Sequence, residues 1–151
     1  MKYLLLDMDG TICEYYDPID NRILMTEFPD EFFTNKVPLM SIIKVIQKDY
    51  KDYVGIIFSV SPNSQTDKEK TQWLYKYGFG NWNKIFLHYP NNDKGQALSV
   101  FIQRNNISPE DITVIDDDHR VLRNCEKLGV HCIHVSHLLA LYESNREYYD
   151  K

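Results

Sequence analysis

The sequence predicts an α/β fold whose core is a doubly wound parallel sheet of about five strands. One observation behind this prediction is the alternation of short apolar runs with segments in which apolar residues recur at helical spacing. The other is the length of 151 residues, which suits one ordinary domain and is too short for two. We therefore expect residues 1–151 to form a single domain in which the strands are KYLLLDMD, YVGIIFSVS, KIFLHY, DITVIDD and HCIHVS.

In the first half of the chain we expect two helices and two of the five strands, the first of these strands being buried. This first strand is expected at 3–6, because the run is apolar on both faces and a glycine and a threonine follow shortly after it. The first helix is expected from Pro38, since proline suits a first turn and the apolar residues after it have helical spacing. The second helix is expected to start with Thr66 and Glu69 as a capping box and to stop near Gly78.

The second half contains three further helices. One runs from Asp93 to about Ile102, and the next starts before Val121 and ends at Gly129. The chain then closes with a strand and a tyrosine-rich helix from about Ser136, whose last residues we expect to fray.

Composition and charge exclude several classes of function. Hydrophobic residues make up 43% of the chain and charged residues 26%, and no apolar run approaches the roughly 20 residues that span a bilayer. Asp7 and Asp9 interrupt the apolar start, which argues against a signal peptide, so we expect a cytoplasmic protein without a membrane partner. The net charge of -5 offers no general attraction to nucleic acid, so a nucleic-acid partner would need a local basic patch.

The three cysteines are Cys13, Cys125 and Cys132. Their number is odd and no C-x-x-C spacing occurs, so neither a disulfide framework nor a zinc site is indicated. We expect free thiols.

Polar side chains that can bind a metal ion or a phosphate follow several of the predicted strands. Ligands of parallel α/β sheets bind at the carboxyl ends of the strands, so we expect these side chains to meet at one edge of the sheet. They are Asp7 and Asp9 after the first strand, Ser59 and Ser61 at the second, Lys94 after the third, and Asp116, Asp117 and Asp118 at the fourth. Such a set can bind Mg²⁺ and phosphate together.

The stretch YLLLDMDGTI is the most informative part of this pattern. An Asp-x-Asp pair at the end of a buried strand is costly to desolvate and therefore needs a cation or another compensating partner. Asp7 would be the nucleophile, held by a cation and by Lys94, and Asp9 would give the leaving group a proton and later activate water. Gly10 would turn the chain away from the site with a positive φ angle and leave room for a substrate.

The predicted site residues include a set that binds phosphate and a set that binds the metal ion. The predicted phosphate-binding residues are Gly10, Thr11, Ser59, Val60 and Ser61, and the predicted metal ligands are Asp7, Asp9, Asp116 and Asp117. Ser59 and Ser61 are alternatives as the main phosphate ligand, and we favour Ser59. The metal ligands would act directly or through water.

The motifs DMDGT, the serine that ends the second strand, DK at the start of a helix and VIDDD resemble the four motifs of the haloacid dehalogenase (HAD) superfamily of phosphohydrolases. Their order and spacing match over nearly the whole chain. The resemblance implies a HAD-like fold and a Mg²⁺-dependent phosphatase with Asp7 as the phosphorylated nucleophile. Members often carry another acid four positions after the metal aspartate, where this chain has Val121, so Asp116 or Asp118 would take that place.

Access to the site bears on the substrate. The segment 12–37 is expected to form a short flap, and there is no room for a sizeable cap domain there or between Tyr89 and Lys94. An open site admits a large substrate, such as a polynucleotide end or a phosphoprotein, unless a neighbouring subunit covers it. The stretch SVSPNSQTDKEKTQWLYKYGF also resembles the 5'(3')-deoxyribonucleotidases, which implies a nucleoside monophosphate with Tyr15, Tyr16 or another flap residue near its base.

Two non-hydrolytic classes are alternatives. A phosphoacceptor receiver domain also combines Mg²⁺, an aspartate, a hydroxyl and a lysine on a five-strand sheet, but its lysine comes last, whereas Lys94 precedes the acidic run here. A silent phosphate-binding module could share the fold, although the intact pair Asp7 and Asp9 argues against it. The sequence leaves the oligomeric state open.

Overall fold

A computed structural model of the protein describes residues 1–15 and 33–151. Five parallel strands form one sheet in the order β3-β2-β1-β4-β5. The strands are β1 (Tyr3–Leu6), β2 (Val54–Val60), β3 (Asn83–Leu87), β4 (Ile112–Asp116) and β5 (His131–His134). The predicted parallel sheet of five strands is confirmed.

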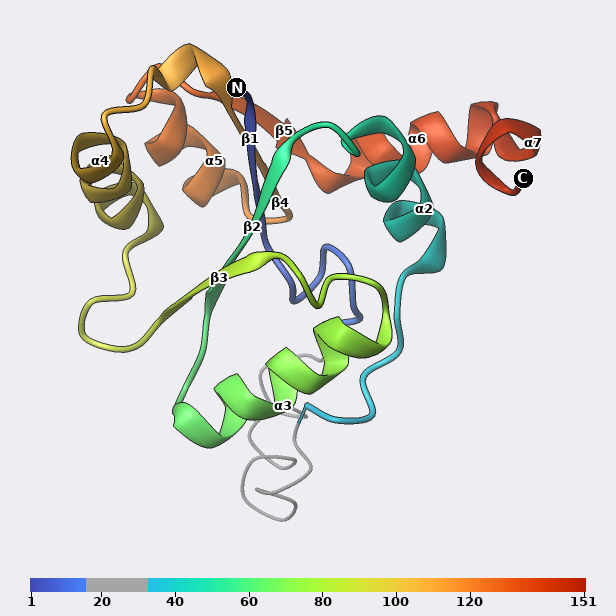
Figure 1. Ribbon diagram of the computed structural model, residues 1–151, viewed down its shortest axis with the longest axis horizontal. Coiled ribbons are helices and arrows are strands. Elements are labelled where there is room, and N and C mark those ends of the chain that lie inside the picture. The colour runs from blue at the N-terminus through green and yellow to red at the C-terminus, as the bar shows by residue number, and fades with distance from the viewer. Residues whose placement is uncertain (16–32) are drawn as a thin grey trace.

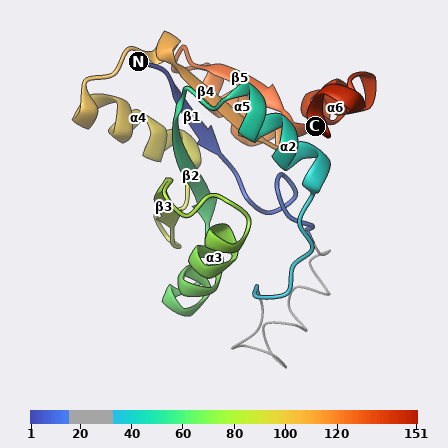
Figure 2. The same cartoon turned by 45° about the vertical axis from the view of Figure 1, so that its right-hand side comes forward.

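Helices cover both faces of the sheet, as Figures 1 and 2 show. One face carries α4 (Lys94–Asn105) and α5 (His119–Glu126), with the short 3₁₀ helix η1 (Pro109–Asp111) before β4. The opposite layer consists of α2 (Met40–Asp49), α3 (Ser64–Lys76), α6 (Val135–Ser144) and α7 (Arg146–Tyr149). The fold is therefore doubly wound, as predicted.

The central strand β1 shows why the sheet is buried on both sides. Successive side chains of a strand point to opposite faces. Leu4 and Leu6 belong to the core beneath α2, α3 and α6, whereas Leu5 belongs to the core beneath α4 and α5. All three leucines are fully buried, which agrees with the apolar run in the sequence.

The start of α3 differs from the prediction. Asn63, rather than Thr66, caps the helix, because its side chain accepts a hydrogen bond from the Thr66 backbone N–H at 2.8 Å. Glu69 does not complete a capping box: its carboxylate accepts hydrogen bonds from the Phe33 backbone N–H and the Thr34 hydroxyl. The helix therefore begins at Ser64, two residues before the predicted start.

The end of the chain also differs from the expectation of fraying. Tyr149 is 7% exposed, and its hydroxyl donates to Asp49 at the end of α2 over 2.8 Å. Lys44 of the same helix pairs with Asp150 at 2.8 Å. These contacts hold α7 against α2.

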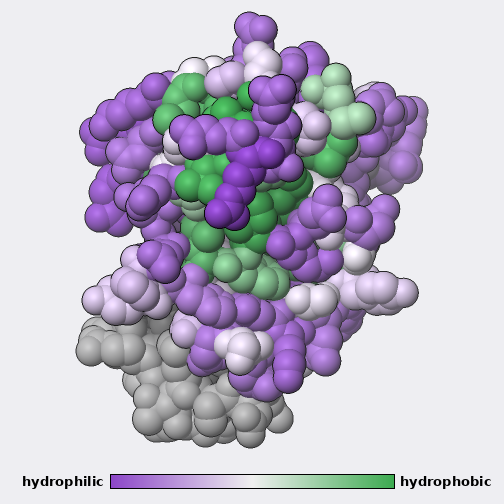
Figure 3. All heavy atoms as spheres, turned by 60° about the vertical axis from the view of Figure 1, so that its left-hand side comes forward, coloured by the Kyte–Doolittle hydropathy of each residue, from purple (hydrophilic) through white to green (hydrophobic). Residues whose placement is uncertain are grey.

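The surface around α4 is mixed in character. Figure 3 shows hydrophobic side chains between hydrophilic ones on the side of the molecule where α4 lies. Partly buried hydrophobic residues of β3 and α4 pack against the core there, among them Ile85, Leu87 and Phe101.

Among residues 1–15 and 33–151, none of the helices has the length and apolar character needed to cross a membrane.

The pairing of the strands brings the predicted functional residues to one edge. Leu6, the last residue of β1, pairs with Ile57 of β2 and with Ile115 of β4, and all three strands run in the same direction, β2 ending three residues further on and β4 one residue further on. The Asp7 backbone N–H continues this pairing by donating to the Ile115 carbonyl at 3.0 Å. The residues that follow β1, β2 and β4 therefore face a common space.

Candidate active site

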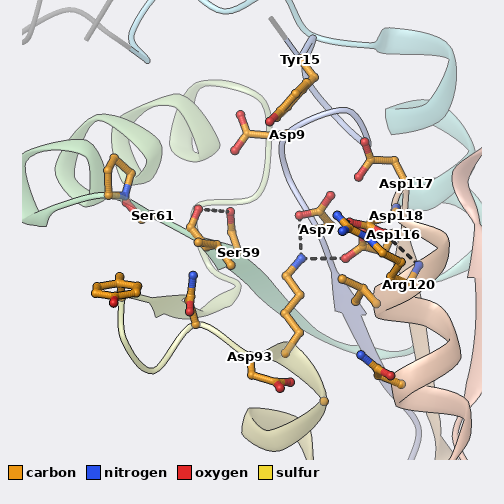
Figure 4. A pocket seen from close by; sticks show the side chains of 18 of the residues that line it. Asp7, Asp9, Tyr15, Ser59, Ser61, Asp93, Asp116, Asp117, Asp118 and Arg120 are labelled. Atoms are coloured by element: carbon orange, nitrogen blue, oxygen red, sulfur yellow. Dashed lines mark hydrogen bonds and ion pairs between the residues drawn. The ribbon is translucent and has the colours of Figure 1, made fainter. Parts of the chain in front are cut away.

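A cavity of about 720 Å³ lies at this edge of the sheet. Its lining comes from the ends of β1, β2 and β4, from the loop before α4 and from the starts of α4 and α5. Figure 4 shows Asp7 in the middle, with Ser59 on one side and Asp116 and Asp117 on the other. The predicted convergence of these strand ends is thus present.

Asp7 is held in place by two partners. The Thr11 hydroxyl donates to Asp7 Oδ2 at 2.9 Å, and Lys94 Nζ donates to Asp7 Oδ1 at 2.8 Å. Thr11 is fully buried, so its hydroxyl serves the Asp7 carboxylate. Lys94 also donates to Asp116 Oδ2 at 2.7 Å and thereby links the acids that follow β1 and end β4.

Lys94 remains charged despite its burial. Burial alone would lower the pKa of this ammonium group, but the neighbouring carboxylates of Asp7 and Asp116 outweigh that effect and raise the pKa. Asp93 caps α4 by accepting from the Gln96 backbone N–H, which fixes where the helix starts. The Asp-Lys pair that opens α4 thus places the lysine beside the nucleophile candidate.

Three carboxylates form a group that suits a divalent cation. Oxygen atoms of Asp7, Asp116 and Asp117 lie within 4.8 Å of one another. Burial and repulsion by Asp7 raise the pKa of Asp116, and burial with the charges of Asp7 and Asp116 raises the pKa of Asp117 to about 8. A bound cation would stabilise the ionised form of these carboxylates, which their neighbours oppose. Mg²⁺ prefers oxygen ligands, so this donor set fits it.

Gly10 makes room for this group. Its φ angle is +79°, as the sequence predicted, which a residue with a side chain rarely adopts. A Cβ atom at this position would lie 2.1 Å from Asp117 Oδ2. The glycine therefore leaves room for the carboxylate of Asp117.

The two serines at the end of β2 are both buried but have different partners. Ser59 Oγ accepts a hydrogen bond from Lys70 Nζ at 2.9 Å. Ser61 Oγ lies 3.4 Å from the Asn63 carbonyl, and its backbone N–H donates to the Leu87 carbonyl at 2.9 Å. Each serine hydroxyl also lies 3.4 Å from a backbone carbonyl oxygen, that of Val60 for Ser59 and that of Asn63 for Ser61.

Two lysines reach the cavity that sequence reasoning did not single out. Lys70 on α3 and Lys36 each pair with Asp9, and both lysine side chains are 2% exposed. Burial alone would raise the pKa of Asp9, but the charges and hydrogen bonds of the two lysines outweigh it and lower the pKa. The side chain of Asp9 therefore faces lysines and is not part of the three-carboxylate group.

Asp118 and Arg120 occupy the rim of the cavity. Asp118 caps α5 by accepting from the Arg120 backbone N–H at 2.8 Å, and it also pairs with the Arg120 guanidinium at 3.2 Å. Of the two alternatives Asp116 and Asp118, it is Asp116 that has a carboxylate oxygen within 4.8 Å of oxygens of Asp7 and Asp117. The exposed aromatic rings of Tyr15 and Tyr89 also line the cavity.

The predicted flap at 12–37 lies largely in 16–32, outside the described residues, and Tyr16 lies there too. Its described ends are packed: Ile12 and Phe33 are fully buried. The loop between β3 and α4 is short and holds no cap domain.

No protein-family model matches the sequence, and no curated protein matches it. Solved structures do match the fold. A HAD family enzyme from Bacteroides thetaiotaomicron, in complex with magnesium and inorganic phosphate, superposes with a TM-score of 0.63 at 14% identity, covering 89% of this chain and 93% of the other.

Two further structures are similar. A haloacid dehalogenase-like hydrolase from Streptococcus pneumoniae has a TM-score of 0.64 at 11% identity, covering 87% of this chain and 83% of the other. A D,D-heptose 1,7-bisphosphate phosphatase from B. bronchiseptica, complexed with magnesium and phosphate, has a TM-score of 0.61 at 16% identity, covering 89% and 79%. The chain therefore has the HAD-like fold.

Proposed function

We propose that the protein is a Mg²⁺-dependent phosphomonoester hydrolase that works through an aspartyl-phosphate on Asp7. The observation that carries this proposal is that the carboxylate of the buried Asp7, held by Thr11 and Lys94, has an oxygen within 4.8 Å of oxygens of two further carboxylates in an open cavity. Solved structures of the same fold that contain magnesium and phosphate support the assignment.

The first step forms a bond between an Asp7 carboxylate oxygen and phosphorus and breaks the bond to the leaving oxygen. Thr11 and Lys94 each bind one oxygen of this carboxylate and so fix its orientation. Lys94 also balances the negative charge that the phosphoryl group brings next to Asp7. Mg²⁺ held by Asp7, Asp116 and Asp117 would supply the remaining neutralisation that lets two anions approach.

Asp9 exchanges protons with the leaving group and with water in this scheme. In the first step a protonated Asp9 gives its proton to the leaving alkoxide, and in the second the Asp9 carboxylate accepts one from the attacking water. Water then breaks the bond between Asp7 and phosphorus and releases inorganic phosphate. The ion pairs with Lys36 and Lys70 favour the carboxylate form, which the second step needs, and oppose the protonated form, which the first step needs.

The experiment that tests the nucleophile is Asp7→Asn with p-nitrophenyl phosphate and Mg²⁺. We expect turnover to fall by at least about 10³-fold, because the amide cannot form the phosphoenzyme bond. The exposed Asp52 offers the same chemical change away from the cavity, so Asp52→Asn should keep wild-type turnover. Wild-type-like phosphate release by Asp7→Asn would contradict the mechanism.

We propose nucleoside monophosphates as the leading small substrates. Tyr15 and Tyr89 line the cavity, and these residues are 57% and 86% exposed. Aromatic rings in such positions can stack on a nucleobase. The measurement is a phosphatase screen across nucleotides, sugar phosphates, phosphopeptides and phosphorylated DNA ends. Equal rates on nucleotides and sugar phosphates would refute the nucleotide preference, and a clear preference for phosphopeptides or DNA ends would favour a large substrate.

A further inference from the structure

The ammonium group of Lys70 binds three acceptors within the protein. Its Nζ lies 2.9 Å from Ser59 Oγ, 2.8 Å from the Val60 carbonyl oxygen and 3.1 Å from Asp9 Oδ2. An ammonium group has three N–H donors and no lone pair. The structure therefore supplies an acceptor for each N–H of Lys70, and the residue is only 1% exposed.

This arrangement determines what the Ser59 hydroxyl can do. Because Lys70 can only donate, the Ser59 oxygen must be the acceptor in their hydrogen bond, and the hydroxyl proton must point elsewhere. Among the described residues its acceptor is the Val60 carbonyl at 3.4 Å, which is long for an O–H···O bond. That carbonyl already accepts from Lys70 at 2.8 Å.

Ser59 lines the cavity and is 1% exposed, so an anionic oxygen placed there would be a better acceptor for its proton than the Val60 carbonyl. We propose that Lys70 is a positioning residue that fixes the Ser59 hydroxyl as a hydrogen-bond donor to the phosphoryl group. The inference rests on the proposed function and adds to it a residue outside the four sequence motifs.

The lysines of the site then have separate tasks. Lys94 contacts Asp7 and Asp116, on the side of the nucleophile. Lys70 contacts Ser59 and Asp9, on the side where the phosphoryl oxygens bind. Lys36 and Lys70 both donate to Asp9. Of these two lysines, Lys70 is the one whose described hydrogen bonds include the Ser59 hydroxyl. Lys36 is therefore the matched control for Lys70.

The test is a double-mutant cycle with Ser59→Ala in three backgrounds: wild type, Lys70→Met and Lys36→Met. The readouts are the dissociation constant of inorganic phosphate in the presence of Mg²⁺, by calorimetry, and kcat/KM on p-nitrophenyl phosphate. In wild type we expect Ser59→Ala to weaken phosphate binding about 10-fold or more, as for loss of a hydrogen bond to a charged group. In the Lys70→Met background, Ser59→Ala should weaken phosphate binding by less than about 3-fold, because Ser59 is no longer held as a donor.

In the Lys36→Met background, Ser59→Ala should weaken phosphate binding by the same factor as in wild type. An equal factor in all three backgrounds would overturn the inference, since Lys70 would then act independently of Ser59. If Lys70→Met does not fold, Lys70→Gln replaces it: its amide can both donate and accept, so it no longer restricts Ser59 to donating, and the effect of Ser59→Ala on phosphate binding should again be smaller than in wild type.

Failure of the proposed function gives a different result. A wild-type protein that neither binds inorganic phosphate nor hydrolyses p-nitrophenyl phosphate would remove both proposals. A wild type that does both, with additive effects of Lys70 and Ser59, would remove this inference alone.

Discussion

Asp9 lies between two buried lysines and thereby differs from its neighbour Asp7, whose partners are one lysine and one hydroxyl. A buried ammonium group is tolerated only when it is paired and hydrogen-bonded. Lys36 and Lys70 both pair with the carboxylate of Asp9, and Lys70 also donates to Ser59 and to the Val60 carbonyl. Loss of Asp9 would therefore affect the stability of the flap end and of α3 as well as proton transfer.

Gly10→Ala is expected to weaken both the fold and the metal site. The left-handed conformation at φ +79° costs a residue with a side chain about 1–2 kcal/mol, and the new methyl group would meet Asp117 Oδ2 at 2.1 Å. We expect a fall of that size in the free energy of unfolding, measured in urea, together with weaker binding of Mg²⁺. Gly129→Ala is the matched control, since its φ angle of +87° is also positive but its Cβ would meet Pro109 Cβ at an ordinary 3.5 Å, so it should lose stability and keep the affinity for Mg²⁺. An unchanged Mg²⁺ affinity in Gly10→Ala would contradict the role given to the glycine.

The site residues differ in how well the sequence predicts them. Asp7, Ser59, Lys94 and Asp116 follow or end strands, or open the next helix, and a parallel sheet brings such positions together. Lys70 lies inside a polar helix, where a lysine is normally solvated. A signal was nevertheless present: Lys70 is four residues after Thr66 and three before Trp73, so it shares the buried face of α3.

Lys36 had no comparable signal. It lies in the irregular segment before α2, where neither helical nor strand periodicity indicates which side chains point inward. Its burial depends on tertiary contacts with Asp9 and with the ring of Phe33.

At the scale of elements, the strands were predicted better than the helix ends. Strand positions follow from apolar runs, whereas the start of α3 depended on which of several polar side chains caps it. Asn63 is the residue whose side chain reaches the Thr66 backbone N–H. The predicted pair Thr66 and Glu69 lies one turn further on, where Glu69 binds the backbone of Phe33.

Asn63→Ala is expected to destabilise the protein by about 1 kcal/mol, because loss of the cap leaves the Thr66 backbone N–H in the first turn of α3 without its side-chain acceptor. The effect should appear as a lower urea midpoint. Gln65→Ala, at an exposed position of the same helix, serves as the control and should change the free energy of unfolding by less than about 0.5 kcal/mol. Equal stability of the two variants would show that the Asn63 cap contributes little.

At the scale of the whole molecule, the sheet gathers charges that would repel one another without a ligand. Of the residues that the structure describes, six with carboxylates and four with cationic side chains line the cavity. Three of the carboxylates, Asp7, Asp116 and Asp117, lie within 4.8 Å of one another, and Lys94 pairs with two of them. One divalent cation at this group would offset the remaining negative charge before a phosphate enters.

Binding of Mg²⁺ should therefore stabilise the whole domain, because its proposed ligands belong to two neighbouring strands and exist as a group only in the folded chain. At a Mg²⁺ concentration 100 times the dissociation constant the gain is about 2.7 kcal/mol, or roughly 5–10 °C in Tm for a chain of this size. The comparison is thermal unfolding in EDTA and in Mg²⁺, with NaCl added to match ionic strength. Asp117→Ala should lose most of the increment, whereas Asp52→Ala should keep it. A Tm that is the same in EDTA and in saturating Mg²⁺, with phosphatase activity retained in both, would show that Asp7, Asp116 and Asp117 serve the reaction without a bound cation.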